Sequence, residues 1–243
     1  MKHLLIVGRS GIGKTTLMRR LTQALRKFPI DGFLTEESRE DEQRVGFWLS
    51  SLDGRQVLLA HRQLASPVHV GPYKVNLSVL EQVAVPILRR AMQQATVLFM
   101  DELGKMELSS KVFEREVQQA FDRGPCIVAT AGVGHIPFLD TIKRRKDVEL
   151  IPLTTSNRAA VEEELVARLT AVCTEDEAIR AIQLQADRIC DLIISGDASA
   201  IDIEIQQAAL RDMIARHFPE KDAVYHLIYE ARFRRLWQQF RHH

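Results

Sequence analysis

The sequence has almost no net charge, few cysteines and no long apolar run near its start, and each absence excludes a class of protein. The formal charge is +1 over 243 residues, so no overall field attracts nucleic acid or an anionic membrane. Cys126, Cys173 and Cys190 form no Cys-x-x-Cys pair, which argues against a zinc knuckle or a redox motif and fits a reducing cytosol. Only four strongly apolar residues precede Gly8, too few for a signal peptide or a membrane span. We therefore expect a soluble cytoplasmic protein without membrane association.

Short apolar runs that alternate with helical patterns dominate the first two thirds of the chain. The runs predicted as buried strands are residues 4–7, 96–100, 126–130 and 148–151. Amphipathic helices are predicted from Lys14, over 77–94, from Ser109 or Ser110, and over 157–172. Buried strands alternating with helices indicate an α/β fold with a mostly parallel sheet covered on both faces.

A small antiparallel insertion is predicted between the first helix and the helix over 77–94. Its strands are residues 32–34, 45–49 and 57–59, separated by charged or Asp-Gly turns. Residues 70–76 are predicted as a loop, because Gly71-Pro72 interrupts regular structure.

The last part of the chain carries only helical patterns, which predicts a domain boundary near Cys173. Residues 1–172 would form the α/β domain and 173–243 an all-α C-terminal extension of about three helices. Residues 174–177, Thr-Glu-Asp-Glu, are interpreted as a capping box that starts a new helix. Breaks are expected at 195–196 and 218–219.

Residues 8–15, GRSGIGKT, fit the G-x-x-x-x-G-K-[ST] phosphate loop, or Walker A motif, at every required position. Glycines let backbone N–H groups turn toward phosphates, and the following helix points its positive end at them. Lys14 is expected to reach the β- and γ-phosphates, and the Thr15 hydroxyl to bind Mg²⁺. A chance glycine turn is the alternative, but the preceding strand and the following helix favour nucleotide binding. The predicted cofactor-binding residues here are Gly8, Arg9, Ser10, Gly11, Ile12, Gly13, Lys14, Thr15 and Thr16.

An acidic pair follows the second buried strand, as a Walker B motif requires. Asp101 is the predicted second metal ligand, because Mg²⁺ that bridges two phosphates is held by an aspartate at a strand end. Glu102 is the predicted catalytic base, which would take a proton from the water that attacks the γ-phosphate. The alternative is that both residues cap the next helix.

Further catalytic candidates follow the third buried strand. Thr130 ends that strand and is predicted near the γ-phosphate, with a strand-end hydroxyl bonded to backbone as the alternative. Arg144 and Arg145, in the basic run 143–146, are candidates for stabilising charge in the transition state. The alternative for this run is a solvated helix end.

Five segments together resemble the THEP-type nucleoside-triphosphatases, which include the human cancer-related nucleoside-triphosphatase. They are GFLTEE, VGFWL, VGPYKVN, DELGKMEL and PFLDTIKRRKDVELIPLTTSNR, and the resemblance covers residues 1 to about 170. It implies a compact phosphate-loop fold that hydrolyses ATP, GTP and other nucleoside triphosphates. It also implies that a second segment contacts the nucleotide: Val97, Leu98, Phe99, Met100, Asp101, Glu102, Leu103 and Gly104.

The resemblance leaves parts of the chain without an assigned role. Lys105 and Glu107 lie in the DELGKMEL motif, but no role follows for them. The loop after Thr130 varies in the family, and the tail after Cys173 has no counterpart there.

Two other functions share the same motifs. A small-molecule or nucleotide kinase would use the same loop, Mg²⁺ and carboxylate toward an acceptor hydroxyl. A nucleotide-dependent switch or adaptor would bind a protein partner through the tail, where apolar residues from Val224 to Phe240 alternate with arginines. The alternative is that these apolar residues pack on the core and that the arginines lie in water or complement a helix C-terminus. Acidic residues in the tail argue against nucleic acid as a partner. We expect hydrolysis, with nucleoside triphosphates as substrates and Mg²⁺ as cofactor.

Overall fold

The computed structural model describes residues 2–221 and 225–241. The chain divides into two compact units, Met1–Cys173 and Thr174–His243. Val224, which begins the apolar series predicted in the tail, lies outside the described residues. Among the described residues, no helix is both long and apolar enough to cross a membrane.

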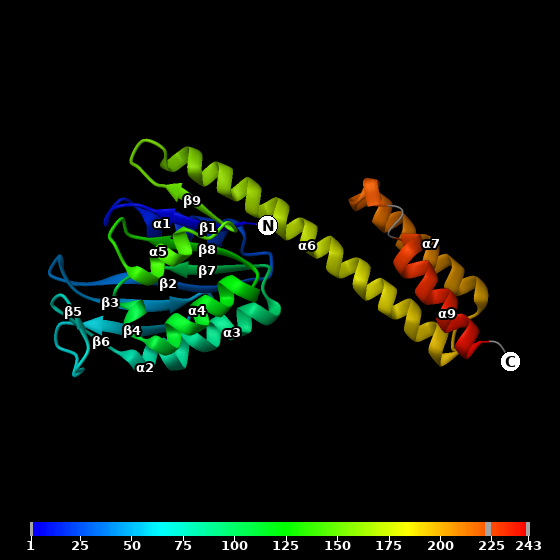
Figure 1. The fold of residues 1–243 in the computed structure, drawn as a ribbon, viewed down its shortest axis with the longest axis horizontal. Helices are drawn as coiled ribbons and strands as arrows, with labels where there is room; N and C mark the ends of the chain where they lie inside the picture. Colours follow the sequence, from blue (N-terminus) through cyan, green and yellow to red (C-terminus); the bar gives the residue numbers. More distant parts are fainter. Residues whose placement is uncertain (1, 222–224, 242–243) are drawn as a thin grey trace. The chain divides into compact units, whose positions relative to one another are not determined.

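The first unit is built on a nine-stranded sheet, coloured from blue to green in Figure 1. The order of its strands is β5-β6-β4-β3-β2-β7-β8-β1-β9. The parallel half consists of β2 (Ile30–Glu40), β7 (Val97–Asp101), β8 (Cys126–Ala131), β1 (His3–Val7) and β9 (Val148–Pro152). The antiparallel half adds β3 (Gln43–Ser51), β4 (Gln56–His61), β5 (His69–Val70) and β6 (Tyr73–Val75).

Helices cover both faces of this sheet, as the continuous apolar strands require. Val97 and Phe99 of β7 pack with α1 (Lys14–Ala24) and with the start of α6 (Arg158–Ser195). Leu98 and Met100 of the same strand point to the other face, which is covered by α3 (Val85–Gln94), α4 (Lys111–Arg123) and α5 (Pro137–Lys143). Because side chains on both faces of the central strands are buried, β1, β7 and β8 form the centre of the core. The predicted α/β class and the predicted parallel strands are confirmed.

The structure corrects the prediction for residues 70–76. This segment forms a short antiparallel hairpin, in which Val70 pairs with Tyr73. Gly71, at φ +57°, makes the turn, so Gly71-Pro72 reverses the chain between two strands. The helical stretch predicted over 77–94 consists of α2 (Leu77–Val79), the π-helical turn η1 (Leu80–Ala84) and α3. A 3-10 turn, η2 (Glu107–Ser109), precedes α4, and Ser110 caps α4 by accepting from the Phe113 N–H.

The predicted helix start at residues 174–177 is wrong, because α6 runs without a break from Arg158 to Ser195. The apolar stripe shifts its phase after Cys173 but continues through Ala178 and Ile182, and no glycine or proline interrupts it. Gly196, at φ +81°, follows its last residue.

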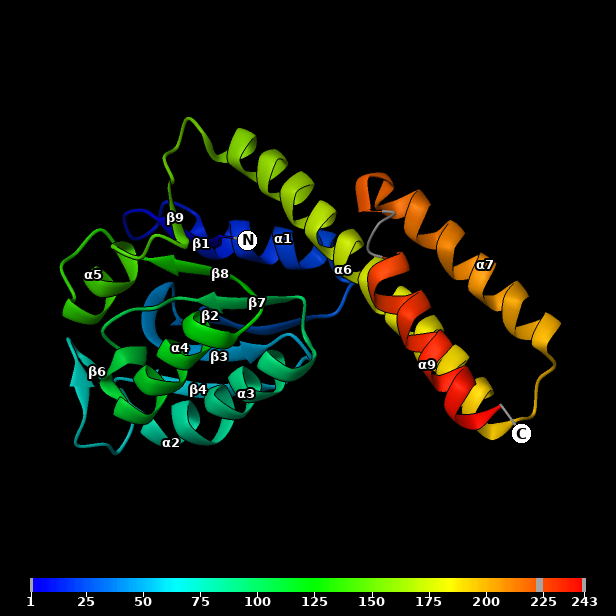
Figure 2. The ribbon, with the colours of Figure 1, turned by 45° about the vertical axis from the view of Figure 1, so that its right-hand side comes forward.

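The second unit is helical, as predicted. Within it, α7 (Ala200–His217) and α9 (Ala231–Phe240) pack beside the second half of α6 (Figure 2). Ser199 and Asp202 form a capping box at the start of α7. The turns η3 (Pro219–Lys221) and η4 (Tyr225–Glu230) lie between α7 and α9, and buried Tyr225 and Phe233 complete this unit's own core.

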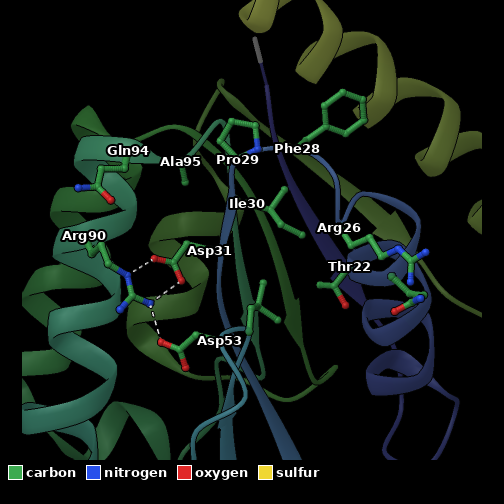
Figure 3. A pocket seen from close by; sticks show the side chains of 12 residues that line it. Thr22, Arg26, Phe28, Pro29, Ile30, Asp31, Asp53, Arg90, Gln94 and Ala95 are labelled. Atoms are coloured by element: carbon green, nitrogen blue, oxygen red, sulfur yellow. Dashed lines mark hydrogen bonds and ion pairs between the residues drawn. The ribbon is translucent and has the colours of Figure 1, made fainter.

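A cavity of about 580 Å³ lies where β2 begins and α1 ends (Figure 3). Arg90 of α3 donates to both oxygens of Asp31 on β2, at 2.6 and 2.9 Å, and to Asp53 at 3.3 Å. Asp31 is nearly buried, so the guanidinium compensates a carboxylate that has little access to water.

Replacing Arg90 by alanine is expected to lower the free energy of unfolding by about 1–3 kcal/mol, because Asp31 then keeps its burial and loses its charged partner. Denaturant unfolding of the variant measures the loss. Arg115→Ala on α4 is the control, because within the described part of the chain Arg115 donates only to the Lys111 carbonyl, and it should change stability by less than about 0.5 kcal/mol. Equal stability of the two variants would contradict the structural role of Arg90.

Candidate functional site

The glycine loop lies where β1 ends and α1 begins, at the carboxyl edge of the parallel strands. Gly13 has φ +98° and directly precedes α1, a backbone conformation that residues with a Cβ rarely adopt. A Cβ at Gly8 would lie 2.8 Å from the Ile12 side chain, so the loop closes tightly on itself. This places the amino end of α1 at the loop, which is the geometry that binds phosphate.

Lys14 folds over this loop and is almost fully buried. Its Nζ donates to the carbonyl oxygens of Gly8 at 3.1 Å and Arg9 at 3.3 Å. The same Nζ lies 3.1 Å from Glu102 Oε2, and the Glu102 side chain is 35% exposed. Lys14 and Glu102 therefore meet in space, although 88 positions separate them in the chain.

Asp101 is fully buried at the end of β7. Burial raises its pKa to about 6, while the hydrogen bond from Thr130, the nearby Thr15 hydroxyl and the charge of Lys14 oppose that rise. Its Oδ1 accepts from Thr130 Oγ1, whereas Oδ2 has no hydrogen-bonded partner among the described residues. A buried carboxylate oxygen without a donor, next to the hydroxyl of Thr15, suits a hard cation such as Mg²⁺.

Thr130 lies on β8, between β7 and β1, and is also fully buried. Its hydroxyl donates to the Asp101 side chain, which differs from the backbone-bonded alternative, while its predicted position near the γ-phosphate stays a prediction. Its carbonyl accepts from the Leu103 N–H at 2.8 Å. Thr130 therefore contacts the chain on both sides of Glu102, at Asp101 through its hydroxyl and at Leu103 through its carbonyl.

Glu107 belongs to the site, although the sequence predicted no role for it. Glu107 is almost fully buried, accepts from the Gly104 N–H at 3.1 Å, and accepts from the Thr35 hydroxyl at 3.4 Å. A Cβ at Gly104 would lie 3.0 Å from Glu107 Oε2 and 3.6 Å from Glu102 Oε1, so both carboxylates approach this glycine. Glu107 is part of the DELGKMEL motif, but its position in the site depends on how the loop folds, which the motif alone does not indicate.

A cavity of about 880 Å³ joins these groups. Its lining includes the loop residues Ser10, Gly11, Gly13, Lys14, Thr15 and Thr16, the carboxylates Glu102 and Glu107, and part of the antiparallel half of the sheet. Arg158, at the start of α6, was not predicted; its guanidinium lies against Gly13 and donates to the Ile12 carbonyl at 3.5 Å.

The structure does not bring all predicted residues to this cavity. Val97, Leu98, Phe99, Met100 and Leu103 are fully buried in the core, so their side chains support the acidic pair and do not face a nucleotide.

The basic run 143–146 also lies elsewhere. Arg145 donates to Asp122, Asp147 and the Phe121 carbonyl, where α4 ends and β9 begins. That is the amino edge of the parallel strands, opposite the glycine loop. Arg144 is exposed at the end of α5. Neither arginine is placed to stabilise charge at the loop.

A comparison with known protein families shows which family the chain belongs to. A family model described as NTPase matches residues 3–166, which contain the glycine loop, the acidic pair and Glu107. The chain belongs to this NTPase family. It is therefore an enzyme of the nucleoside-triphosphatase class, and its fold is a phosphate-loop core with a helical extension beyond the matched residues.

Named relatives agree with that assignment. The NTPase is 42% identical over 166 residues to nucleoside-triphosphatase THEP1 of Thermotoga maritima, an alignment that covers 68% of this chain and 94% of the relative. It is 36% identical over 172 residues to the human cancer-related nucleoside-triphosphatase, covering 65% of this chain and 90% of the relative. The crystal structure of THEP1 from Aquifex aeolicus superposes with a TM-score of 0.64 at 36% identity, covering 69% of this chain and 98% of that one.

Burial of Glu107 predicts that the stability of the NTPase depends on pH. Burial, and then the charges of Glu102 and Asp101, raise its pKa from 4.5 to about 8, against the effect of backbone hydrogen bonds. Between these two pH values the folded protein binds more protons than the unfolded chain, so this group lowers the free energy of unfolding as pH rises.

Glu107→Gln removes this penalty and is expected to gain stability over the wild type as pH rises from about 5 to about 8. The gain should reach at least about 1 kcal/mol, or about 2–4 °C in Tm. Melting curves of both proteins at the two pH values measure it, with the exposed Glu164→Gln as control. A constant difference in Tm across this range would contradict the assignment.

Proposed function

We propose that this NTPase hydrolyses nucleoside triphosphates, ATP and GTP among them, to the diphosphate and phosphate in a Mg²⁺-dependent reaction. The observation that carries the proposal is the contact of Lys14 with Glu102 in the lining of the cavity, with buried Asp101 directly beside Glu102 in the chain and within the electrostatic influence of Lys14. The names of the relatives support a nucleoside triphosphate as substrate without specifying its base.

Each residue has a role that follows from its position. The loop N–H groups and Lys14 would hold the β- and γ-phosphates and offset the charge that develops on them. Thr15 and Asp101 would hold Mg²⁺ together with phosphate oxygens. Among the described residues no group of three or more His, Cys, Asp or Glu side chains could hold a metal ion, and phosphate oxygens with water would complete a shell that Thr15 and Asp101 begin. Thr130 would position Asp101 through its hydroxyl.

Glu102 is the proposed base. Its side chain is partly exposed, so water can reach it, and its contact with Lys14 supports a position beside the γ-phosphate that Lys14 would bind. The water oxygen would attack the γ-phosphorus as its proton passes to Glu102 and the bond to the β-phosphate oxygen breaks. Asp101, with no exposed surface, suits the metal role better than the base role.

Phosphate release from each common nucleoside triphosphate, without any acceptor, tests this proposal. We expect release with Mg²⁺ and its loss when a chelator removes the metal, because the cation offsets the charge of the β- and γ-phosphates. Phosphate transfer that requires an added acceptor would contradict hydrolysis and favour a kinase.

A further inference from the structure

The cavity continues past the phosphate loop into a charged pocket that the proposed hydrolysis does not use. We name this pocket the distal arm; it is lined by Glu37, Arg39, Arg44, Phe47 and Tyr73. Its residues come from β2, β3 and β6, the antiparallel part of the sheet. The sequence predicted only residues 32–34 as the strand that the structure extends to Glu40.

The distal arm opens from the end of the cavity where the γ-phosphate is proposed to lie. Leu34 of β2 pairs with Asp101, the last residue of β7, and β2 then extends beyond β7. Thr35 donates to Glu107, next to the acidic pair, and Glu37 follows two residues later on the same strand. Residues 35–37 of β2 therefore connect the surroundings of Glu107 to the distal arm.

Positive side chains outnumber negative ones in the arm. Glu37 accepts from Arg39 at 2.6 and 2.9 Å and from Arg44 at 2.8 Å, so one carboxylate serves two guanidinium groups. Arg44 also donates through Nε to the Tyr73 hydroxyl at 3.1 Å, which fixes the plane of its guanidinium. Its Nη2 has no hydrogen bond to any described residue. An oriented guanidinium with unused N–H groups matches the oxygens of a phosphate group.

We propose that the distal arm is a second anion subsite, which holds a phosphate-bearing small molecule beside the γ-phosphate of the bound triphosphate. Its location next to the γ-phosphate rests on the proposed function, whereas its charge does not. The excess of guanidinium groups favours an anion over a neutral molecule. A small molecule is the occupant we favour, because the arm is one part of a cavity of about 880 Å³ whose lining also includes the turn of the β5–β6 hairpin.

Binding of AMP, a phosphate monoester, to the full chain tests this subsite. The protein is first saturated with Mg²⁺ and a non-hydrolysable imido analogue of ATP, so that AMP cannot enter the phosphate loop. Labelled AMP is then added in equilibrium dialysis. We expect one AMP per chain, competition by inorganic phosphate, and no binding of adenosine, which lacks the phosphate.

Arginine variants test whether AMP binds in the distal arm. Arg44→Gln and Arg39→Gln should each weaken AMP binding by at least about tenfold, as expected for loss of a charged hydrogen-bond donor. Arg39 is more exposed than Arg44, so its replacement tests the arm even if Arg44→Gln fails to fold. Arg20→Gln is the matched control, because Arg20 lies on α1 and pairs with Glu162 outside the cavity.

Two results would overturn the subsite: no AMP binding to the loaded protein, or equal AMP affinity in folded Arg39→Gln, Arg44→Gln and wild-type protein. Phosphate release from ATP by the same wild-type preparation, measured without AMP and before the analogue is added, separates the two proposals. Release without AMP binding removes the subsite and leaves the hydrolase intact. AMP binding without release removes the hydrolase and leaves an anion site.

Discussion

Lys14→Ala is expected to lower kcat/KM for nucleoside triphosphates by about 10²–10³-fold, the loss typical when one preorganised donor to the transition state is removed. The Lys14 ammonium is nearly buried, and the loop carbonyls of Gly8 and Arg9 hold it in place, so it is preorganised for a phosphate. A truncated side chain leaves a gap that water can enter, and water does not replace a fixed positive charge. Steady-state phosphate release measures the effect.

Lys111→Ala is the control for the lysine variant. Lys111 lies exposed on α4, pairs with Glu114, and is not part of the cavity that contains the loop. Its replacement should leave kcat/KM within about twofold of the wild-type value, as expected for a surface change. If Lys14→Ala behaved like Lys111→Ala, Lys14 would not contact the transferred phosphate.

Glu102→Gln is expected to separate binding from hydrolysis. Glutamine keeps the shape of the side chain and loses the capacity to accept a proton, so the rate should fall by about 10²–10⁴-fold. Nucleotide affinity should stay equal or increase, because neutralising Glu102 frees Lys14 from its ion pair. Single-turnover phosphate release gives the rate, and binding of a fluorescent nucleotide gives the affinity.

The carboxylate control is Glu164→Gln on α6, which removes one exposed charge far along the chain from the acidic pair. It should change neither rate nor affinity. Normal turnover in Glu102→Gln would show that another group takes the proton from water, and the base assignment would be wrong.

The parallel strands, the glycine loop and the acidic pair could be predicted because their signals are local. An apolar run such as residues 96–100 needs burial on both faces, and a strand followed by Gly8 to Thr15 and an amphipathic helix has one common structural solution. The hairpin at Gly71-Pro72 was missed because its two strands are too short to carry a periodic pattern.

Features set by distant contacts could not be predicted in the same way. The capping-box pattern at residues 174–177 competes with an apolar stripe that continues along α6, and packing of that stripe decides the outcome. Arg145 looked like a cation for the site until its partners Asp122 and Asp147 were known. Glu107 is buried beside Glu102 only because the loop turns back at Gly104.

Hydrolysis of a triphosphate in ¹⁸O-labelled water tests the central claim, that water attacks the γ-phosphorus of the bound triphosphate in a Mg²⁺-dependent reaction. We expect one heavy oxygen in each released phosphate and none in the nucleoside diphosphate, with turnover and label both dependent on Mg²⁺. Heavy oxygen in the diphosphate, or phosphate that leaves the triphosphate only when an acceptor is added, would contradict it.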